Sequence, residues 1–152
     1  MAPLTILLIT FLVVILADRF LLKGRVGLSL AGRIAMACML LLTGIAHFTS
    51  TDAMIQMMPD AIPYKREVVW FTGICELLAI PGLLWHRTAK LTSVVLIVFF
   101  IAILPANIAG SLNSAGMGGS EYGPWYLLFR IPLQIFFIGW VWYFGLKIKK
   151  TG

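Results

Sequence analysis

Long apolar stretches recur along this chain, and they constrain its fold more than any other feature. Each is close to the roughly 20 residues that a helix needs, at about 1.5 Å per residue, to cross a hydrocarbon layer about 30 Å thick. The stretches lack the apolar–polar alternation over about ten residues that is typical of a strand in a membrane barrel. We therefore predict an all-α membrane protein with five spans, at about 3–22, 28–48, 68–85, 91–112 and 125–146.

The composition agrees with a lipid environment. Hydrophobic residues make up 61% of the chain and charged residues only 12%, whereas soluble domains average about 25% charged residues. In a soluble protein the formal charge of +6 would suggest a nucleic-acid partner. Here most lysines and arginines lie in short segments between apolar stretches, where they indicate membrane topology instead. We expect contact with the lipid bilayer and no nucleic acid.

The first apolar stretch is interrupted by Asp18 and Arg19. No lysine or arginine precedes it, whereas a cleaved signal peptide has its positive residues before the apolar run. We expect this helix to be retained. We accordingly divide the chain into an N-terminal membrane helix with its turn (1–24) and a four-helix membrane domain (25–152).

The basic residues alternate along the chain. They occur around the first connection, in the third connection and at the end of the chain: Arg19, Lys23, Arg25, Arg33, Arg87, Lys90, Lys147, Lys149 and Lys150. Segments rich in lysine and arginine stay on the cytoplasmic side. The sequence thus predicts an N-terminus outside and a C-terminus inside.

The two segments on the predicted outer side differ in character. The first, TSTDAMIQMMPDAIPYKRE (49–67), begins with capping residues and holds a Met-rich run, which indicates a partial helix in the membrane interface. It is either an amphipathic connector or a lid over a site. The second, GSLNSAGMGGSEYG (110–123), is rich in Gly and Ser, as expected of a flexible linker.

Polar residues inside the predicted spans are the candidate site. A charged group in hydrocarbon costs several kcal/mol, so such residues usually face the interior of a bundle and mark a functional site or an ion pair. The candidates are His47, Glu76, Asn107 and Arg130, with Gln134 one turn beyond Arg130. At 1.5 Å per residue, the first four lie about 16–25 Å from the nearest cytoplasmic basic residue. Each comes from a different helix, so a four-helix bundle could bring them to one outward-opening pocket.

Glycine precedes two of these residues by one helical turn. Gly44 lies three residues before His47, and Gly73 lies three residues before Glu76, within the similar segments TGIAHF and TGICEL. Residues three apart share a helical face. Because small residues let neighbouring membrane helices approach closely, we expect close helix contacts beside both polar groups.

Glu76 needs compensation to stay in the bilayer. It can pair with Arg130, which is the interpretation we favour, or it can be protonated and hydrogen-bonded. The polar residues allow two interpretations. In one, the pair only holds helices together and water satisfies His47. In the other, the site binds a lipophile with a polar head, such as a quinone or lipid; His47 or Arg130 then donates to a quinone carbonyl and Glu76 relays a proton.

The sequence gives little support for thiol redox chemistry or metal binding. Cys38 and Cys75 differ by about 10 Å in predicted depth, which exceeds the reach of a disulfide. Neither cysteine belongs to a CxxC motif, and no metal-ligand spacing occurs. We predict neither a thiol redox pair nor a metal site, and catalytic residues cannot be assigned.

Five short motifs follow one another within about residues 30–144: GIAHF (44–48), MMPDAIP (57–63), TGICELLAIPGLL (72–84), LPANI (104–108) and LFRIPLQ (128–134). In this order they resemble the DoxX-like family of small bacterial integral membrane proteins. The resemblance implies an inner-membrane location and four core helices, with His47, Glu76, Asn107 and Arg130 at motif positions. Some relatives in the wider group are associated with quinone-linked sulfur oxidation, and others with membrane complexes that handle oxidative stress. The additional N-terminal helix departs from the family pattern.

The sequence therefore leads to two hypotheses about function. The first is a membrane component of quinone-linked redox metabolism that binds a quinone-like ligand and receives electrons from a partner, such as a membrane redox protein, or from a soluble donor. The alternative is a non-enzymatic assembly or chaperone-type protein that holds the transmembrane helix of a partner. A transporter would require a homo-oligomer to form a path. Whether the protein is an enzyme stays open.

Overall fold

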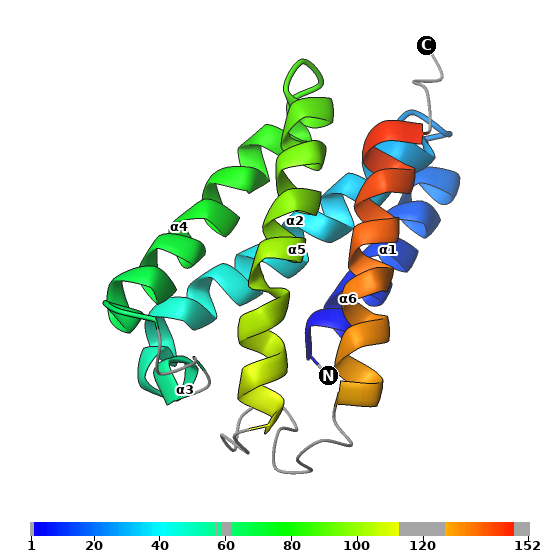
Figure 1. Ribbon diagram of the computed structural model, residues 1–152. Coiled ribbons are helices and arrows are strands. Elements are labelled where there is room, and N and C mark those ends of the chain that lie inside the picture. The colour runs from blue at the N-terminus through cyan, green and yellow to red at the C-terminus, as the bar shows by residue number, and fades with distance from the viewer. Residues whose placement is uncertain (1, 57, 59–61, 113–126, 148–152) are drawn as a thin grey trace.

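The computed structural model describes residues 2–56, 58, 62–112 and 127–147, and it describes no side chains at 106, 107, 109–112 and 127–130. These residues form six α-helices (Figure 1): α1 (Ala2–Phe20), α2 (Gly27–Thr49), α3 (Thr51–Gln56), α4 (Lys65–Leu84), α5 (Ala89–Leu112) and α6 (Leu127–Trp142). The last helix continues into a π-helical turn, η2 (Tyr143–Lys147). The prediction of an all-α protein is confirmed.

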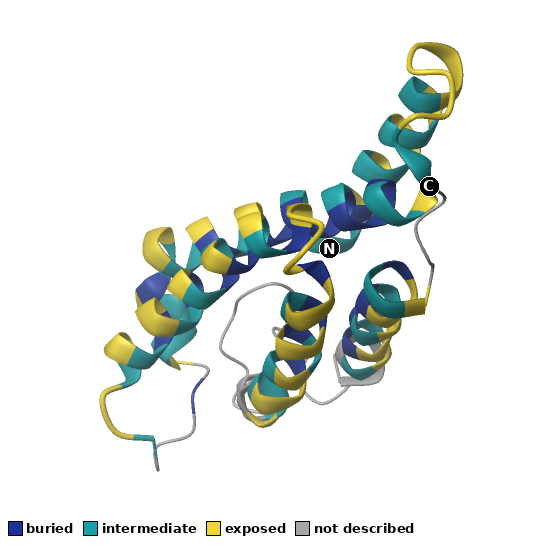
Figure 2. Cartoon of the chain, turned by 90° about the horizontal axis from the view of Figure 1, so that it is seen from above, coloured by how far each residue is buried: buried dark blue, intermediate teal, exposed yellow. Residues whose placement is uncertain are grey.

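Three helices are long and apolar enough to cross a membrane: α1, α2 and α4. The other two long helices contain shorter apolar segments within the described residues, Ala89–Pro105 and Ile131–Lys147. Large apolar side chains on the outer faces are exposed, among them Leu12 (58%), Phe71 (66%) and Leu91 (68%) (Figure 2). Such faces suit lipid rather than water. The chain is thus a candidate multi-pass membrane protein, and the crossing by α5 and α6 stays a prediction.

The core is built around α2, which runs obliquely across the bundle (Figure 1). Its most extensive contacts are with α4 and then with α1, whereas α5 packs chiefly on α6. Buried apolar side chains from all five long helices form one cluster, including Leu7, Met36, Leu40, Leu83, Leu96, Phe100, Phe137 and Val141. On α1, Leu7 is fully buried, and the ring of Phe11 meets that of Trp140 edge-on at 4.8 Å. The first helix thus contributes to the same core as the others; the division of the chain at residue 24 stays a prediction.

The short helix α3 confirms the expected partial helix between the second and third spans. It packs against α4. Trp70 Nε1 donates a hydrogen bond to Thr51 Oγ1 at 3.2 Å, and Arg66 Nη2 pairs with Asp52 Oδ1 at 2.7 Å. These contacts fix α3 to the start of α4. Whether it serves as a connector or a lid stays open. The Gly- and Ser-rich segment (110–123) lies largely outside the described residues.

The basic connections gather at one end of the bundle. The α1–α2 turn, the α4–α5 turn and the end of η2 lie at the same end, opposite α3 (Figure 1). This is the arrangement that alternating topology requires of segments on one side of a membrane. Which side faces the cytoplasm stays a prediction.

Asp18, which interrupts the first apolar stretch, caps the next helix. Its Oδ1 accepts a hydrogen bond from the Val26 N–H at 2.9 Å, and its Oδ2 accepts from the Gly27 N–H at 3.4 Å. These amides begin α2, where the helix dipole favours negative charge. The carboxylate thus ties the end of α1 to the start of α2.

We expect Asp18→Ala to lower the free energy of unfolding by about 1 kcal/mol, the usual cost of losing a helix cap. Unfolding of the purified protein in mixed micelles with increasing dodecyl sulfate measures it. Arg19→Ala, at the exposed neighbouring position, should change the same free energy by less than about 0.5 kcal/mol. Equal values for the two variants would show that the turn does not depend on the cap.

Candidate intramembrane polar site

Close contact between α2 and α4 creates the site. A Cβ at Gly73 would lie 2.7 Å from His47 Cβ, and a Cβ at Gly44 would lie 2.8 Å from Leu77 Cδ2. Real Cβ atoms essentially never approach another atom within 3.0 Å. Both glycines therefore stand where the helices touch, as the sequence predicts. The contact places the polar side chains of the two helices opposite one another.

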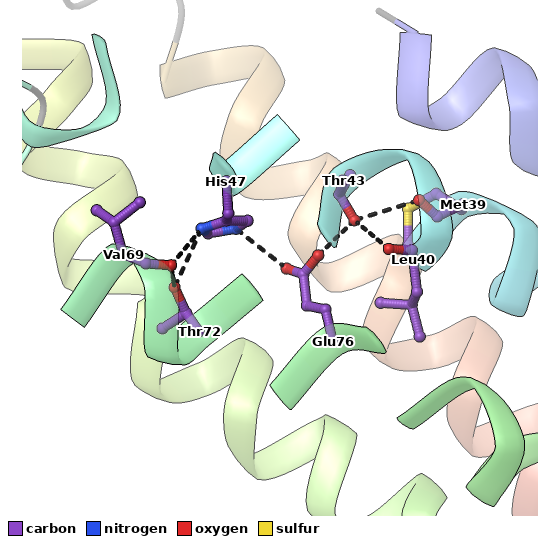
Figure 3. Close-up of polar contacts among 7 residues, drawn as sticks. All are labelled: Met39, Leu40, Thr43, His47, Val69, Thr72 and Glu76. Atoms are coloured by element: carbon purple, nitrogen blue, oxygen red, sulfur yellow. Dashed lines mark hydrogen bonds and ion pairs between the residues drawn. The ribbon is translucent and has the colours of Figure 1, made fainter. Parts of the chain in front are cut away.

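His47 and Glu76 face each other across this contact (Figure 3). His47 Nε2 lies 3.6 Å from Glu76 Oε1, and the two side chains are only 17% and 6% exposed. Thr43 Oγ1 lies 2.5 Å from Glu76 Oε2, at the short end of the range for hydrogen bonds to a carboxylate. In the described part of the chain, the partners of Glu76 are therefore His47 and Thr43.

The other edge of the imidazole is fixed by the backbone. His47 Nδ1 lies 2.9 Å from the Val69 carbonyl oxygen and 3.1 Å from Thr72 Oγ1, and Thr72 Oγ1 donates to the same carbonyl at 2.8 Å. A carbonyl oxygen only accepts hydrogen bonds, so we assign the proton to Nδ1. This assignment leaves Nε2 as the nitrogen that faces Glu76.

With Nδ1 protonated, His47 and Glu76 can together hold one further proton. It lies either on Nε2, giving an imidazolium beside a carboxylate, or on Glu76, giving a neutral pair. Thr43 can serve both states. Its hydroxyl donates to Oε2 in the first; in the second it can accept from a protonated Oε2 and donate to the Met39 carbonyl oxygen at 3.2 Å. Thr43 therefore keeps its hydrogen bond to Glu76 wherever that proton lies.

Two residues that the sequence analysis does not identify, Thr43 and Thr72, complete the site. Thr43 contacts Glu76 on the facing helix, and Thr72 contacts His47 on the facing helix, so the contacts are reciprocal. The signal was present in the similar segments TGIAHF and TGICEL, because each places a threonine four residues before the ionisable residue. Residues four apart lie on one helical face. The two similar segments thus make reciprocal threonine contacts between α2 and α4.

The remaining predicted site residues belong to α5 and α6. Gln134 is buried, and its Nε2 donates to the Phe100 carbonyl oxygen at 2.9 Å, which links the two helices. Asn107 lies in α5 and Arg130 in α6, but their side chains are outside the described residues. The structure therefore brings together His47 and Glu76. The convergence of all the candidates, and the pairing of Glu76 with Arg130, stay predictions.

A family model matches most of the chain. It is described as Domain of unknown function (DUF8561) and matches residues 36–145, so the chain belongs to this family. The matched residues include the whole polar site. No curated protein and no solved structure shows a significant match.

Proposed function

We propose that this member of the family is a membrane component of quinone-linked redox metabolism, in the inner membrane of a bacterium, and that its polar site binds a quinone-like lipophile. The observation that carries the proposal is the buried contact of His47 Nε2 with Glu76 Oε1 at 3.6 Å, in which His47 Nδ1 is held by the Val69 carbonyl oxygen. Bound quinones take up protons when they are reduced. A buried pair that exchanges one proton suits that chemistry. The resemblance to the DoxX-like family supports the same proposal.

The donor set at the site fits a quinone carbonyl, which needs a hydrogen-bond donor. His47 Nδ1 is occupied by the Val69 carbonyl, so only Nε2 is left to donate. His47 is also the more exposed of the two, at 17% against 6% for Glu76. In this proposal the Glu76 carboxylate stabilises the imidazolium, whose Nε2–H donates a hydrogen bond to the ligand carbonyl. When the reduced ligand takes that proton, His47 is left neutral and regains a proton from water by way of Glu76. Thr43 and Thr72 are positioning residues.

The polar residues of α5 and α6 also have roles in this proposal. Arg130 of α6 and Asn107 of α5, which the resemblance places at motif positions, complete the ligand site in this proposal. Gln134 links these two helices through the Phe100 carbonyl oxygen. The sequence carries no haem, flavin or thiol-pair motif. The electrons therefore come from a membrane redox partner or from a soluble donor.

The alternative, a chaperone-type protein that holds a partner helix, has less support. It relies on small-residue faces that a foreign helix could pack against. Gly44 and Gly73 are covered within the chain by Leu77 and by His47 with Phe48. These two positions are thus already used for internal packing.

Native mass spectrometry with lipid extraction tests the proposal on gently solubilised protein. We expect a quinone to remain bound to the wild type, and its occupancy to fall by about tenfold or more in His47→Leu and Arg130→Ala, since each loses a charge-assisted donor. Arg66→Ala is the matched control, because Arg66 is exposed and pairs with Asp52 away from the site. It should keep the ligand.

Two outcomes would contradict the proposal. One is a wild-type protein that carries no quinone and shows no saturable binding of added short-chain quinones. The other is equal occupancy in all four proteins, which would place any bound quinone outside this site.

A further inference from the structure

A second polar feature lies at the other end of the bundle, where the basic connections gather. Here a small cavity lies between α2, α4, α5, α6 and η2. Its walls are mostly apolar, and Arg33 and Ser93 are the polar side chains that line it. Beside them there is space for about one water-sized atom. A cationic side chain thus borders an otherwise apolar cavity.

Arg33 is buried, with 8% of its surface exposed. Its Nη1 donates to the Leu83 carbonyl oxygen at 3.2 Å, and its Nε donates to the Ser29 carbonyl oxygen at 3.4 Å. The first contact caps the C-terminal end of α4, whose dipole supplies only about half a negative charge. A guanidinium carries five N–H donors. In the described ranges no carboxylate lies within ion-pair distance of Arg33. Among the described residues, this guanidinium therefore has two carbonyl acceptors and no carboxylate partner.

The wall formed by η2 places the cavity near the membrane surface. Phe144 and Gly145 of the π-helical turn line it, and Ser29 Oγ donates to the Phe144 carbonyl oxygen at 2.8 Å. Lys147 follows Gly145 by two residues. Its Nζ lies 5.2 Å from the ring centre of Trp142 and 5.6 Å from that of Tyr143. Tryptophan, tyrosine and lysine in this arrangement are typical of a membrane–water interface. π-helical turns occur frequently at functional sites.

We propose that this cavity binds the phosphate group of an anionic membrane lipid. One phosphate oxygen enters the space beside Arg33 and accepts hydrogen bonds from the guanidinium, while the rest of the headgroup stays at the mouth near Lys147. Arginine suits phosphate because its donors form a planar fork. Basic pockets between membrane helices on the cytoplasmic side bind such headgroups. The acyl chains then lie along the exposed apolar faces of the neighbouring helices.

Native mass spectrometry of the full chain in detergent, titrated with phosphatidylglycerol or phosphatidylcholine, tests this site. We expect the wild type to retain phosphatidylglycerol at least about tenfold more tightly, because only this lipid keeps a net negative charge. Arg33→Gln should abolish the preference. Arg87→Gln, at an exposed position in the α4–α5 turn, should keep it.

The wild-type titration decides the question even if Arg33→Gln fails to fold. Equal retention of the two lipids by the wild type would overturn the proposal. A folded Arg33→Gln protein that still prefers phosphatidylglycerol would show that Arg33 only caps α4. Inorganic phosphate that displaces the lipid at equal concentration would identify free phosphate as the ligand and overturn the lipid assignment. Quinone occupancy is not expected to change in any of these arms, since His47 and Glu76 belong to a different site.

Discussion

Gly73→Ala is expected to lower the free energy of unfolding by about 2–3 kcal/mol, because α2 and α4 leave no space for a methyl group. The added Cβ would lie 2.7 Å from His47 Cβ and 3.1 Å from Phe48 Cε2. A Cβ is bonded directly to the backbone and cannot rotate away from its neighbour. The helices must therefore separate, which also moves His47 away from Glu76. Unfolding in mixed micelles measures the stability, and quinone occupancy measures the effect on the site.

Two other glycines provide matched controls. A Cβ at Gly139 meets nothing within 4 Å, so Gly139→Ala should be neutral or stabilise α6 by up to about 1 kcal/mol through helix propensity. The nearest atoms to a Cβ at Gly44 are Cδ2 and Cγ of the flexible Leu77 side chain, at 2.8 and 2.9 Å, and a backbone oxygen at 3.5 Å. Gly44→Ala should therefore cost less than Gly73→Ala. Equal stability of all three variants would contradict the close approach at Gly73.

Much of the fold could be predicted because it depends on length and apolarity. A helix that crosses a membrane must satisfy its own backbone, so each long apolar run specifies one helix and leaves few alternatives. The five long helices lie where the apolar stretches predicted them, within a few residues at the described ends. The helix contacts at Gly44 and Gly73 could also be predicted from the sequence. Small residues in membrane helices commonly lie where two helices approach closely.

The partners within the site could not be predicted equally well. Counting residues along a helix gives the depth of a side chain but not the direction it faces across the bundle. Depth and opposite charge therefore favoured Arg130 as the partner of Glu76, whereas the described contacts of Glu76 are with His47 and Thr43. The surroundings of Arg33 could not be predicted from the sequence either. Its position among basic residues indicated topology, but only the packing of α2 against α4 and η2 shows that it is buried at a cavity.

A double-mutant cycle decides which partner stabilises Glu76. We expect Glu76→Leu and His47→Leu each to lower the free energy of unfolding by about 2–4 kcal/mol, because each leaves a buried polar group without its partner. The double variant removes both groups together, so it should cost less than the sum of the two, with a coupling of at least about 1 kcal/mol.

The parallel cycle combines Glu76→Leu with Arg130→Leu. If Glu76 is compensated mainly by His47, this coupling should stay below about 0.5 kcal/mol. A larger coupling to Arg130 than to His47 would instead support the pair that charge complementarity predicts. It would also weaken the proposed proton exchange, because an arginine keeps its proton and would hold Glu76 as a carboxylate. The two cycles therefore separate a site that shares a proton from one that only joins helices.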